Sequence, residues 1–192
     1  RTSSRPRLGR CAFLTSEVLR RRSSDGAGED AGVAVEAARF EIAPHNCFAC
    51  GELNEHGLQL RLHLADRGSW TELTLPDRFE GWQGIAHGGI LATIIDEVMA
   101  WALFTDDRVG LTARLAVDLR RPAPIGRPIR ADGWIANQRR LRYDTAARIV
   151  DVSTGDLLVE ATGVYVAAPP SRARELRERY RIRVAVPAGD RS

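Results

Sequence analysis

Apolar and polar positions alternate along several stretches of the chain, with the period of two that is typical of half-buried β-strands. Upstream, this alternation predicts a strand over residues 58–64 and another near Ser69–Leu75, which ends at Pro76. Downstream, the same pattern predicts further strands at residues 111–119, near 129–137, near 142–152 and near 157–167. Residues 153–156 then form the turn of a hairpin between the last two strands.

One stretch, His87–Leu103, is helix-like in length and apolar nearly all round, which predicts a buried helix rather than a surface helix. A single helix followed by four antiparallel strands is not a βαβ repeat, so the pattern indicates the α+β class. Near the end of the chain, Ser171 is expected to cap a short helix that runs to Tyr180 and is rich in Arg and Glu.

A carboxylate, Asp96, lies in the middle of the predicted buried helix. No Arg or His stands at helical spacing from it, so we expect Asp96 to be buried and unpaired. Such a carboxylate is costly and usually indicates chemistry. A structural role, with Asp96 bonded to a distant Arg or to a backbone amide, is the alternative.

The start of the same helix carries Gly88 and Gly89, which let another group approach the first free backbone amides. Amides at this position suit an anion, or a carbonyl oxygen that becomes an anion. A tight turn before the helix is the other reading of the glycine pair.

The spacing of these two elements favours a site shared between two copies of the chain. Gly89 and Asp96 are separated by about 10 Å along a helix, at roughly 1.5 Å per residue. An aspartate side chain does not span that gap, so one carbonyl group cannot touch both elements of one helix. Two antiparallel helices related by a twofold axis would place Asp96 of one copy beside Gly88 and Gly89 of the other.

The motif His87-Gly88-Gly89, with Asp96 nine residues after the histidine, resembles the central helix of hotdog-fold acyl-CoA thioesterases. Within this 4-hydroxybenzoyl-CoA thioesterase superfamily it is most similar to the phenylacetate-pathway (PaaI-like) type. The upstream segment Cys47–Gly51 and the downstream segment Arg120–Gly126, which contains RPAPIG, are also similar to members of the family. The resemblance covers about residues 45–168.

The resemblance implies an antiparallel sheet wrapped around one long central helix, dimers that join two sheets edge to edge, and no metal or organic cofactor. It implies that Asp96 is the general base or nucleophile and that the Gly88 amide polarises the thioester carbonyl. His87 corresponds to the histidine that buttresses the turn. Thr112 stands where some members position the attacking water. Alternation puts it on the face opposite Leu111 and Leu115, away from the helix, from which it could still reach a site at the dimer seam; an ordinary strand threonine is the alternative.

Four residues are assigned to substrate binding: Gly89, Gln83, Arg139 and Arg140. The two arginines belong to an Arg-rich turn that could hold the phosphates of coenzyme A. A solvated hairpin turn is the alternative interpretation of this turn.

A cluster of His45, Cys47, Cys50 and His56 supplies four potential metal ligands within twelve residues. Its spacing matches no common zinc finger, and a redox pair would need a thioredoxin-like setting. We therefore expect structural thiols and no metal, with a metal site and a redox pair as the alternatives.

Composition divides the 192 residues into a predicted disordered Arg/Ser-rich arm and linker (1–40), a hotdog domain (41–168) and a tail with a short helix (169–192). All 28 basic residues are Arg, and the net charge is +3. Three cysteines make no disulfide framework, which favours a cytoplasmic protein. The arm also resembles an organelle transit peptide. No transmembrane span and no nucleic-acid partner are expected.

Together these features predict an acyl-CoA thioesterase that hydrolyses an acyl-CoA or aryl-CoA to free acid and CoA. A homodimer is expected, and a homotetramer built from two dimers is the larger alternative. Two other functions remain open: a non-catalytic hotdog domain that binds or senses acyl-CoA, and a hotdog dehydratase or hydratase that would use His87.

Overall fold

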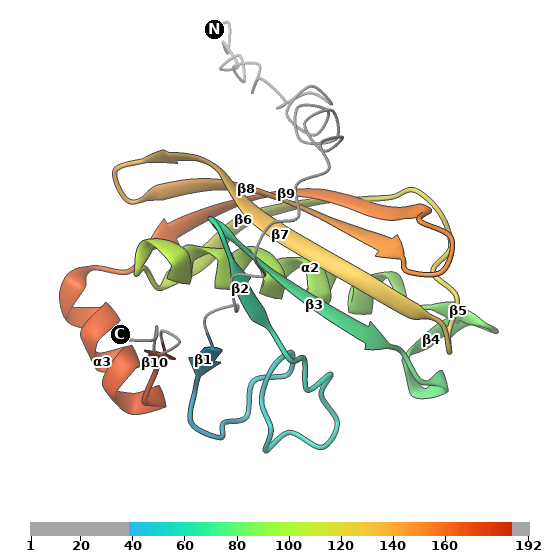
Figure 1. Ribbon diagram of the computed structural model, residues 1–192, viewed down its shortest axis with the longest axis horizontal. Coiled ribbons are helices and arrows are strands. Elements are labelled where there is room, and N and C mark those ends of the chain that lie inside the picture. Colours follow the sequence, from blue (N-terminus) through green and yellow to red (C-terminus); the bar gives the residue numbers. More distant parts are fainter. Residues whose placement is uncertain (1–38, 186–192) are drawn as a thin grey trace, which may run out of the picture. The chain divides into compact units, whose positions relative to one another are not determined.

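A six-stranded antiparallel sheet dominates the computed structural model, which describes residues 39–185. The strand order is β2-β3-β7-β8-β9-β6, and every neighbouring pair is antiparallel. The strands are β2 (His63–Ala65), β3 (Gly68–Thr74), β6 (Gly110–Leu119), β7 (Pro128–Arg139), β8 (Arg142–Asp151) and β9 (Leu157–Ala167). The sheet curves around one helix, α2 (Gly88–Ala102), which continues into the 3-10 helix η2 (Leu103–Asp106; Figure 1).

The apolar side of α2 lies against the concave face of the sheet, and the helix backbone comes unusually close to two strands. A side chain at Gly133 of β7 would place its Cβ 2.6 Å from the carbonyl group of Val98. Ser69 of β3 donates a hydrogen bond to the Val98 oxygen at 2.6 Å. The helix therefore contacts the strands directly through its backbone as well as through its side chains. The buried side chains of the helix are Leu91, Ile94, Ile95, Val98, Met99, Trp101 and Ala102.

Short elements complete the described residues. The hairpin of β4 (Glu80–Trp82) and β5 (Ile85–Ala86) follows the 3-10 helix η1 (Asp77–Phe79) and leads into α2. β1 (Arg39–Glu41) pairs with β10 (Arg183–Ala185), and α3 (Pro170–Tyr180) precedes β10. The Arg177 guanidinium pairs with the Asp107 carboxylate at 2.5 Å, which ties α3 to the end of η2.

The predicted α+β class, the central helix and the strands after it are confirmed, but the strand predicted over residues 58–64 is wrong. Only its last two residues are in β2. Gln59 adopts a left-handed conformation (φ 49°), and the amides of Leu58 and Leu60 bond to the carbonyls of Phe48 and Ala49. The side chains of this segment do alternate between buried and exposed. A loop that lies against the core can show this alternation without forming a strand.

Two predictions near the ends of the domain need correction. The arm was predicted to extend to residue 40, yet β1 begins at Arg39; the rest of the arm lies outside the described residues. Ser171 was expected to cap the last helix, but α3 starts earlier, with Pro169 at the N-cap and Pro170 at the first helical position. Proline is favoured there because that position needs no N–H donor.

The segment Gly88–Asp106 is long and apolar enough to cross a membrane by length and composition alone, contrary to the expectation that no segment would be. The core helix of a folded domain passes the same test. Here the apolar side chains of α2 pack against the sheet, and Asp96 accepts hydrogen bonds from Thr112 of β6 and Tyr165 of β9. The packing of the helix explains its apolar composition.

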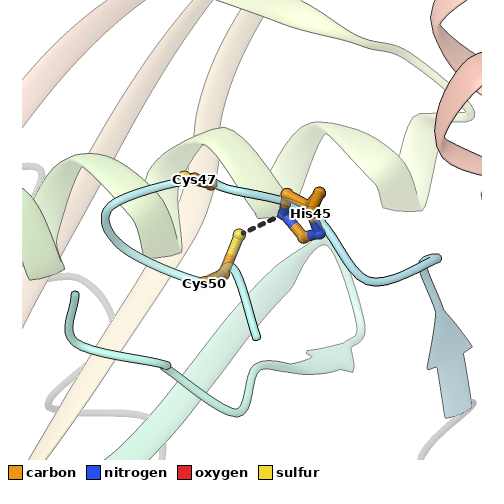
Figure 2. Close-up of side chains that lie close together, drawn as sticks. All are labelled: His45, Cys47 and Cys50. Carbon is orange, nitrogen blue, oxygen red and sulfur yellow. Dashed lines mark hydrogen bonds between the residues drawn. The ribbon is translucent and has the colours of Figure 1, made fainter. Parts of the chain in front are cut away.

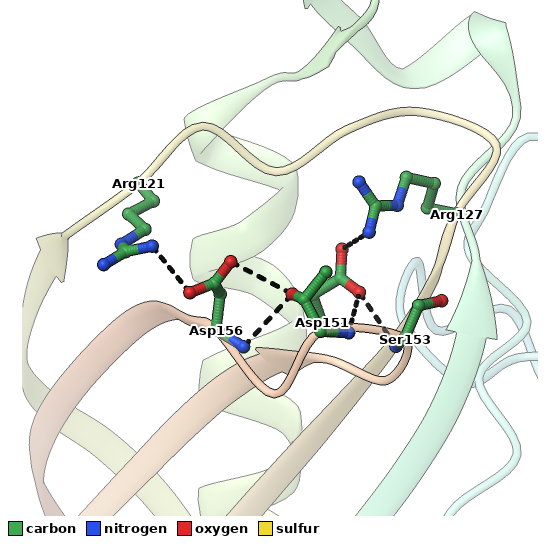
Figure 3. Close-up of polar contacts among 6 residues, drawn as sticks. Arg121, Arg127, Asp151, Ser153 and Asp156 are labelled. Atoms are coloured by element: carbon green, nitrogen blue, oxygen red, sulfur yellow. Dashed lines mark hydrogen bonds and ion pairs between the residues drawn. The ribbon is translucent and has the colours of Figure 1, made fainter.

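The turn between β8 and β9 is held by the buried carboxylate of Asp151 (Figure 3). Its Oδ1 accepts hydrogen bonds from the amides of Ser153 (2.9 Å) and Thr154 (3.1 Å), and Oδ2 pairs with Arg127 at 2.9 Å. Burial opposes ionisation, but these amides and Arg127 outweigh it and hold the pKa of Asp151 below its usual value. The carboxylate thereby links the hairpin turn to the segment before β7.

Replacing Asp151 with asparagine is expected to lower the free energy of unfolding at neutral pH. The folded-state pKa of Asp151 lies below the unfolded value of about 3.9, so its contribution is present above that pH and is lost as the pH falls through the folded-state pKa. Denaturant unfolding of both proteins at pH 7 and at pH 3 checks this. The two proteins should converge at low pH; an equal difference at both pH values would contradict the assignment.

Candidate active site

The carboxylate of Asp96 accepts two hydroxyl hydrogen bonds at the centre of α2. Thr112 Oγ1 donates to Asp96 Oδ1 at 2.8 Å, and the Tyr165 hydroxyl donates to the same oxygen at 2.6 Å. The side chain is half-buried. The expectation of a buried and unpaired carboxylate is therefore wrong, because strands β6 and β9 supply partners that the sequence of the helix does not reveal.

Thr112 faces the helix because β6 contains a bulge. Thr112 pairs with Tyr165 of β9, and the register then shifts between Thr112 and Arg114. A bulge adds one residue to a strand and reverses the alternation beyond it. Thr112 thus shares a face with Leu115, which packs on the core, while Leu111 is 69% exposed. The predicted orientation of Thr112, away from the helix, is corrected by this bulge.

Sequence reasoning missed Tyr165. Its ring is fully buried, and burial together with the bond to Asp96 raises the pKa of the phenol, so the hydroxyl is a neutral donor. Its hydroxyl also lies 3.0 Å from the backbone oxygen of Asp96. The only signal in the sequence is a tyrosine at an inward position of the last strand, and its role depends on a contact 69 residues away.

Both hydroxyls bind Oδ1, so the other oxygen of Asp96 is left for a ligand. Among residues 39–185, no hydrogen bond reaches Asp96 Oδ2. One fixed oxygen and one available oxygen are what a carboxylate needs in order to take a proton from water or to attack a carbonyl carbon.

At the start of α2, His87 is the N-cap residue. Its Nδ1 accepts a hydrogen bond from the Gly89 amide at 3.0 Å, and its backbone oxygen accepts from Ile90 (2.9 Å) and Leu91 (3.2 Å). The Gly88 amide has no hydrogen-bond partner among the described residues. The two glycines therefore differ: the amide of Gly89 is occupied by the cap, and the amide of Gly88 is available to an incoming oxygen.

The remaining sequence-predicted residues lie on exposed turns. Gln83 is in the turn of the β4–β5 hairpin, next to the start of α2. Arg139 and Arg140 form the β7–β8 turn, at the sheet end that also carries Thr112. Three strand spacings separate β7 from β6, roughly 14 Å at about 4.8 Å each. The structure brings Thr112 to Asp96, near the middle of α2. The Gly88 amide remains at the start of the helix, away from Asp96 of the same copy.

Comparison with known proteins relates this arrangement to one family. Residues 83–157, from the β4–β5 turn to the start of β9, match the family model of the thioesterase superfamily. The sheet wrapped around α2 is the hotdog fold.

Three similar proteins illustrate the range of this superfamily. Acyl-coenzyme A thioesterase THEM4 of Xenopus laevis is 32% identical over 92 residues, which are 47% of this chain and 41% of the relative, so the match spans less than half of that protein. The E. coli PaaI protein from the phenylacetic acid degradation operon shares the fold with a TM-score of 0.55 and 16% identity, over 58% of this chain and 81% of its own length.

The third is a hypothetical thioesterase of Streptococcus pneumoniae solved with coenzyme A, with a TM-score of 0.51 and 15% identity over 68% of this chain and 89% of that chain. The same protein has been solved as two variants, in which alanine replaces an aspartate or a threonine sixteen positions further along.

The central helix carries a second acid, Glu97, beside Asp96. Burial raises the pKa of Glu97 to about 7, against hydrogen bonds from Cys50 and from Trp101 Nε1, the latter at 3.0 Å. The side chain lies close to Cys50, in the loop before β2. Sequence reasoning did not single out Glu97, because only the fold brings this loop onto the helix.

That loop gathers part of the predicted cysteine cluster (Figure 2). His45 Nε2 lies 3.4 Å from Cys50 Sγ, and the potential ligand atoms of His45, Cys47 and Cys50 all lie within 4.8 Å of one another. The Cys50 thiol and nearby amides lower the pKa of Cys47 to about 5. His56, the fourth predicted member, is exposed and outside the group. Cys47 and Cys50 form no disulfide.

Replacing Tyr165 with phenylalanine is expected to lower kcat for thioester hydrolysis about tenfold, because Asp96 loses its shortest hydrogen bond and is oriented less firmly. A hydrogen bond to a charged group is worth about 1.5–3 kcal/mol, so the free energy of unfolding should also fall, by about that amount at most. Steady-state kinetics and denaturant unfolding measure both quantities.

Tyr143→Phe is the matched control for this substitution. Tyr143 is also fully buried and pairs with Tyr165 across β8 and β9, but its hydroxyl accepts from Gln138 at 2.8 Å instead of binding Asp96. We expect the control to keep the wild-type kcat. Equal kcat values for wild type and Tyr165→Phe would remove Tyr165 from the site.

Proposed function

We propose that this protein hydrolyses the thioester bond of an acyl-CoA or aryl-CoA, releasing the free acid and CoA. The observation that carries the proposal is the Asp96 carboxylate, with Oδ1 fixed by two hydroxyls and Oδ2 available to a ligand. The match to the thioesterase superfamily, the named activity of the Xenopus relative and the coenzyme A in the Streptococcus pneumoniae structure support the same substrate class.

In the proposed reaction, Asp96 acts as general base. Its carboxylate takes a proton from a water molecule, the resulting hydroxide oxygen adds to the thioester carbonyl carbon, and the C–S bond breaks to release CoA. In the alternative, Asp96 Oδ2 attacks the carbonyl carbon itself, CoA leaves, and water then hydrolyses the mixed anhydride. In a single turnover in ¹⁸O-water, ¹⁸O in the Asp96 carboxylate identifies the second route, with water adding to the aspartyl carbonyl of the anhydride; the first route places ¹⁸O only in the released acid.

Thr112 is proposed to position the attacking water. Its hydroxyl hydrogen is donated to Asp96, so its oxygen lone pairs are free to accept from a water molecule beside Oδ2. Asp96 and Thr112 are sixteen residues apart, the same separation as the aspartate and threonine replaced in the two Streptococcus pneumoniae variants. This agreement supports the pairing of an acid with a hydroxyl in the site.

The thioester oxygen is proposed to bind the Gly88 amide of a second copy of the chain. Within one copy, eight residues of helix separate Gly88 from Asp96, about 12 Å at about 1.5 Å per residue. The positive end of the helix dipole would stabilise the negative charge that develops on this oxygen. His87 holds the turn in place through its bond to Gly89.

A homodimer is the proposed assembly, and exposed apolar side chains support it. β6 is the last strand in the sheet order and has no further neighbour among residues 39–185. Leu111 and Leu119 of this strand are 69% and 56% exposed, and Trp82 of β4 is 82% exposed. An unpaired strand edge with exposed apolar side chains favours pairing with another copy. Association of two such dimers is the further step to a tetramer.

Substrate contacts are assigned to the exposed β7–β8 turn and to the residues around the start of α2. Arg139 and Arg140 are proposed to bind the phosphates of CoA, and Gln83 with Gly89 to line the entrance beside the second copy's helix. The hydrolytic step uses a carboxylate and a backbone amide, so we propose no metal ion or organic cofactor at the Asp96 centre. Free thiols at Cys47 and Cys50 suit a reducing compartment such as the cytoplasm.

The test is release of free CoA thiol from a panel of short, long and aromatic acyl-CoAs. Turnover of at least one of them supports the proposal and begins to define the acyl pocket. Tight binding of an acyl-CoA without turnover of any substrate would overturn it and favour a domain that binds or senses acyl-CoA.

A further inference from the structure

The loop of residues 45–51, here called the His/Cys loop, takes no part in the proposed hydrolysis. Its side chains lie near Glu97, whereas the Thr112 and Tyr165 hydroxyls bind Asp96. Three groups that can bind a cation meet in this loop, the imidazole of His45 and the thiols of Cys47 and Cys50, and the Glu97 carboxylate is close to Cys50.

The sulfur of Cys50 lies at the centre of this group. It lies 3.4 Å from His45 Nε2 and within 4.8 Å of the Cys47 sulfur, and the Glu97 carboxylate is also close to it. Cys50 has one thiol hydrogen and three neighbours able to accept it. The thiol can therefore donate to only one of these acceptors, and the lone pairs of the other two receive no hydrogen from it. A cation in the middle would meet all of these lone pairs at once.

The spacing of the donor atoms fits one tetrahedral zinc ion. Zn–S bonds of about 2.3 Å and Zn–N bonds of about 2.1 Å place a sulfur and a nitrogen about 3.6 Å apart, and two sulfurs about 3.8 Å apart. His45 Nε2 and Cys50 Sγ are 3.4 Å apart, and all three pairs lie within 4.8 Å. Small side-chain adjustments would bring the three atoms into one coordination sphere.

His45 is already oriented as a metal ligand. Its Nδ1 lies 2.9 Å from the Ala43 carbonyl oxygen, a bond that places the ring hydrogen on Nδ1 and leaves the lone pair of Nε2 toward Cys50. A backbone carbonyl on the second ring nitrogen is the usual support of a zinc-bound histidine. The Tyr180 ring, in edge contact with a centroid distance of 5.6 Å, holds the imidazole from the other side.

The loop backbone also holds Cys47 in place. The amide of Gly51 donates a hydrogen bond to the Cys47 backbone oxygen at 3.0 Å. This turn closes so tightly that a Cβ on Gly51 would lie 2.4 Å from both the Cys47 nitrogen and the His45 oxygen. Glycine is thus the residue that allows the three ligands to converge.

We propose that the His/Cys loop binds one zinc ion through His45 Nε2, Cys47 Sγ and Cys50 Sγ, with Glu97 facing the fourth position. Nitrogen and sulfur donors select zinc over magnesium or calcium. The ion would fasten the loop to α2 beside Asp96. This site is independent of the hydrolytic chemistry, and it assigns to the cysteines a role that their sequence spacing alone did not favour.

The test is the zinc content of the full-length protein, purified without chelator and analysed by elemental mass spectrometry. We expect about one zinc per chain in the wild type and in Asp96→Asn, and loss of at least nine-tenths of it in His45→Ala and Cys50→Ser. His56→Ala, outside the group, is the matched control and should retain the metal. Cobalt substitution should give the thiolate-to-metal charge-transfer absorption in wild type and lose it in Cys50→Ser.

A second readout uses the wild-type protein alone, in case the variants fail to fold. Removing zinc with a chelator should lower the melting temperature by about 5 °C or more, and one equivalent of zinc should restore it. The proposal would be overturned if the wild type neither contains nor binds stoichiometric zinc, or if wild type and His45→Ala contain equal zinc. A different bound metal, or a Cys47–Cys50 disulfide in the protein isolated from cells, would also overturn it.

Discussion

Asp96→Asn is expected to lower kcat for thioester hydrolysis by about a thousandfold or more. General bases typically contribute 10²–10⁴-fold to a rate, and an amide neither takes a proton from water nor attacks a carbonyl carbon. The amide oxygen of asparagine still accepts hydrogen bonds from Thr112 and Tyr165, so the free energy of unfolding and the affinity for acyl-CoA should change little. Steady-state release of CoA thiol and denaturant unfolding check the two parts.

The matched control for this substitution is Asp118→Asn. Asp118 lies on β6, the strand that carries Thr112, but its side chain is 70% exposed and pairs with Arg120 at 3.6 Å. We expect wild-type kcat from the control. A kcat of Asp96→Asn within tenfold of wild type would contradict a base or nucleophile at this position, and an unfolded variant would be replaced by Asp96→Glu, which should also be severely impaired.

Gly88→Pro is expected to lower kcat about 10²–10³-fold, the usual cost of losing one oxyanion-hole donor. Proline removes the amide hydrogen and little else, because the first position of a helix needs no N–H donor and favours proline. His87 has φ −64° and ψ 132°, the extended conformation that a residue before proline prefers. A Cβ at residue 88 would meet only the flexible Leu119 side chain, 2.9 Å from its Cδ1.

Gly88→Ala distinguishes the loss of the amide hydrogen from the effect of adding a side chain at residue 88. Alanine keeps the N–H and introduces the same Cβ next to Leu119, so kcat should stay within a few-fold of wild type. If Gly88→Ala and Gly88→Pro lose activity equally, the effect comes from crowding and the amide has no special role. A fully active Gly88→Pro would likewise exclude the Gly88 amide as the donor.

Local patterns were enough to predict the elements that make the fold. The apolar run at residues 87–103 gave α2, because a helix covered by a sheet must be apolar on most of its surface. Alternation gave β3 and the strands after α2 to within a few residues. It failed at residues 58–64, where every second side chain is buried but the backbone bonds to the loop at Phe48 and Ala49 instead of to a strand.

The partners of Asp96 could not be predicted in this way. Both hydroxyls come from strands far along the chain, 16 and 69 residues away, and one of them faces the helix only because of a bulge. Most residues of β6 are exposed, so its sequence does not show where the alternation between inward and outward side chains shifts at the bulge. Likewise, Glu97 and the cysteines meet through the packing of the loop before β2 on α2, which no local spacing encodes.

The central claim is that each site combines Asp96 of one copy with the Gly88 amide of another, and mixed dimers test it most directly. Asp96→Asn and Gly88→Pro chains, each with its own affinity tag, are co-expressed, and dimers carrying both tags are isolated and assayed for CoA thiol release. A shared site predicts up to half of the wild-type kcat per dimer, because one of its two sites is then intact. Activity no higher than that of the two parent homodimers, with soluble mixed dimers in hand, would contradict the shared site.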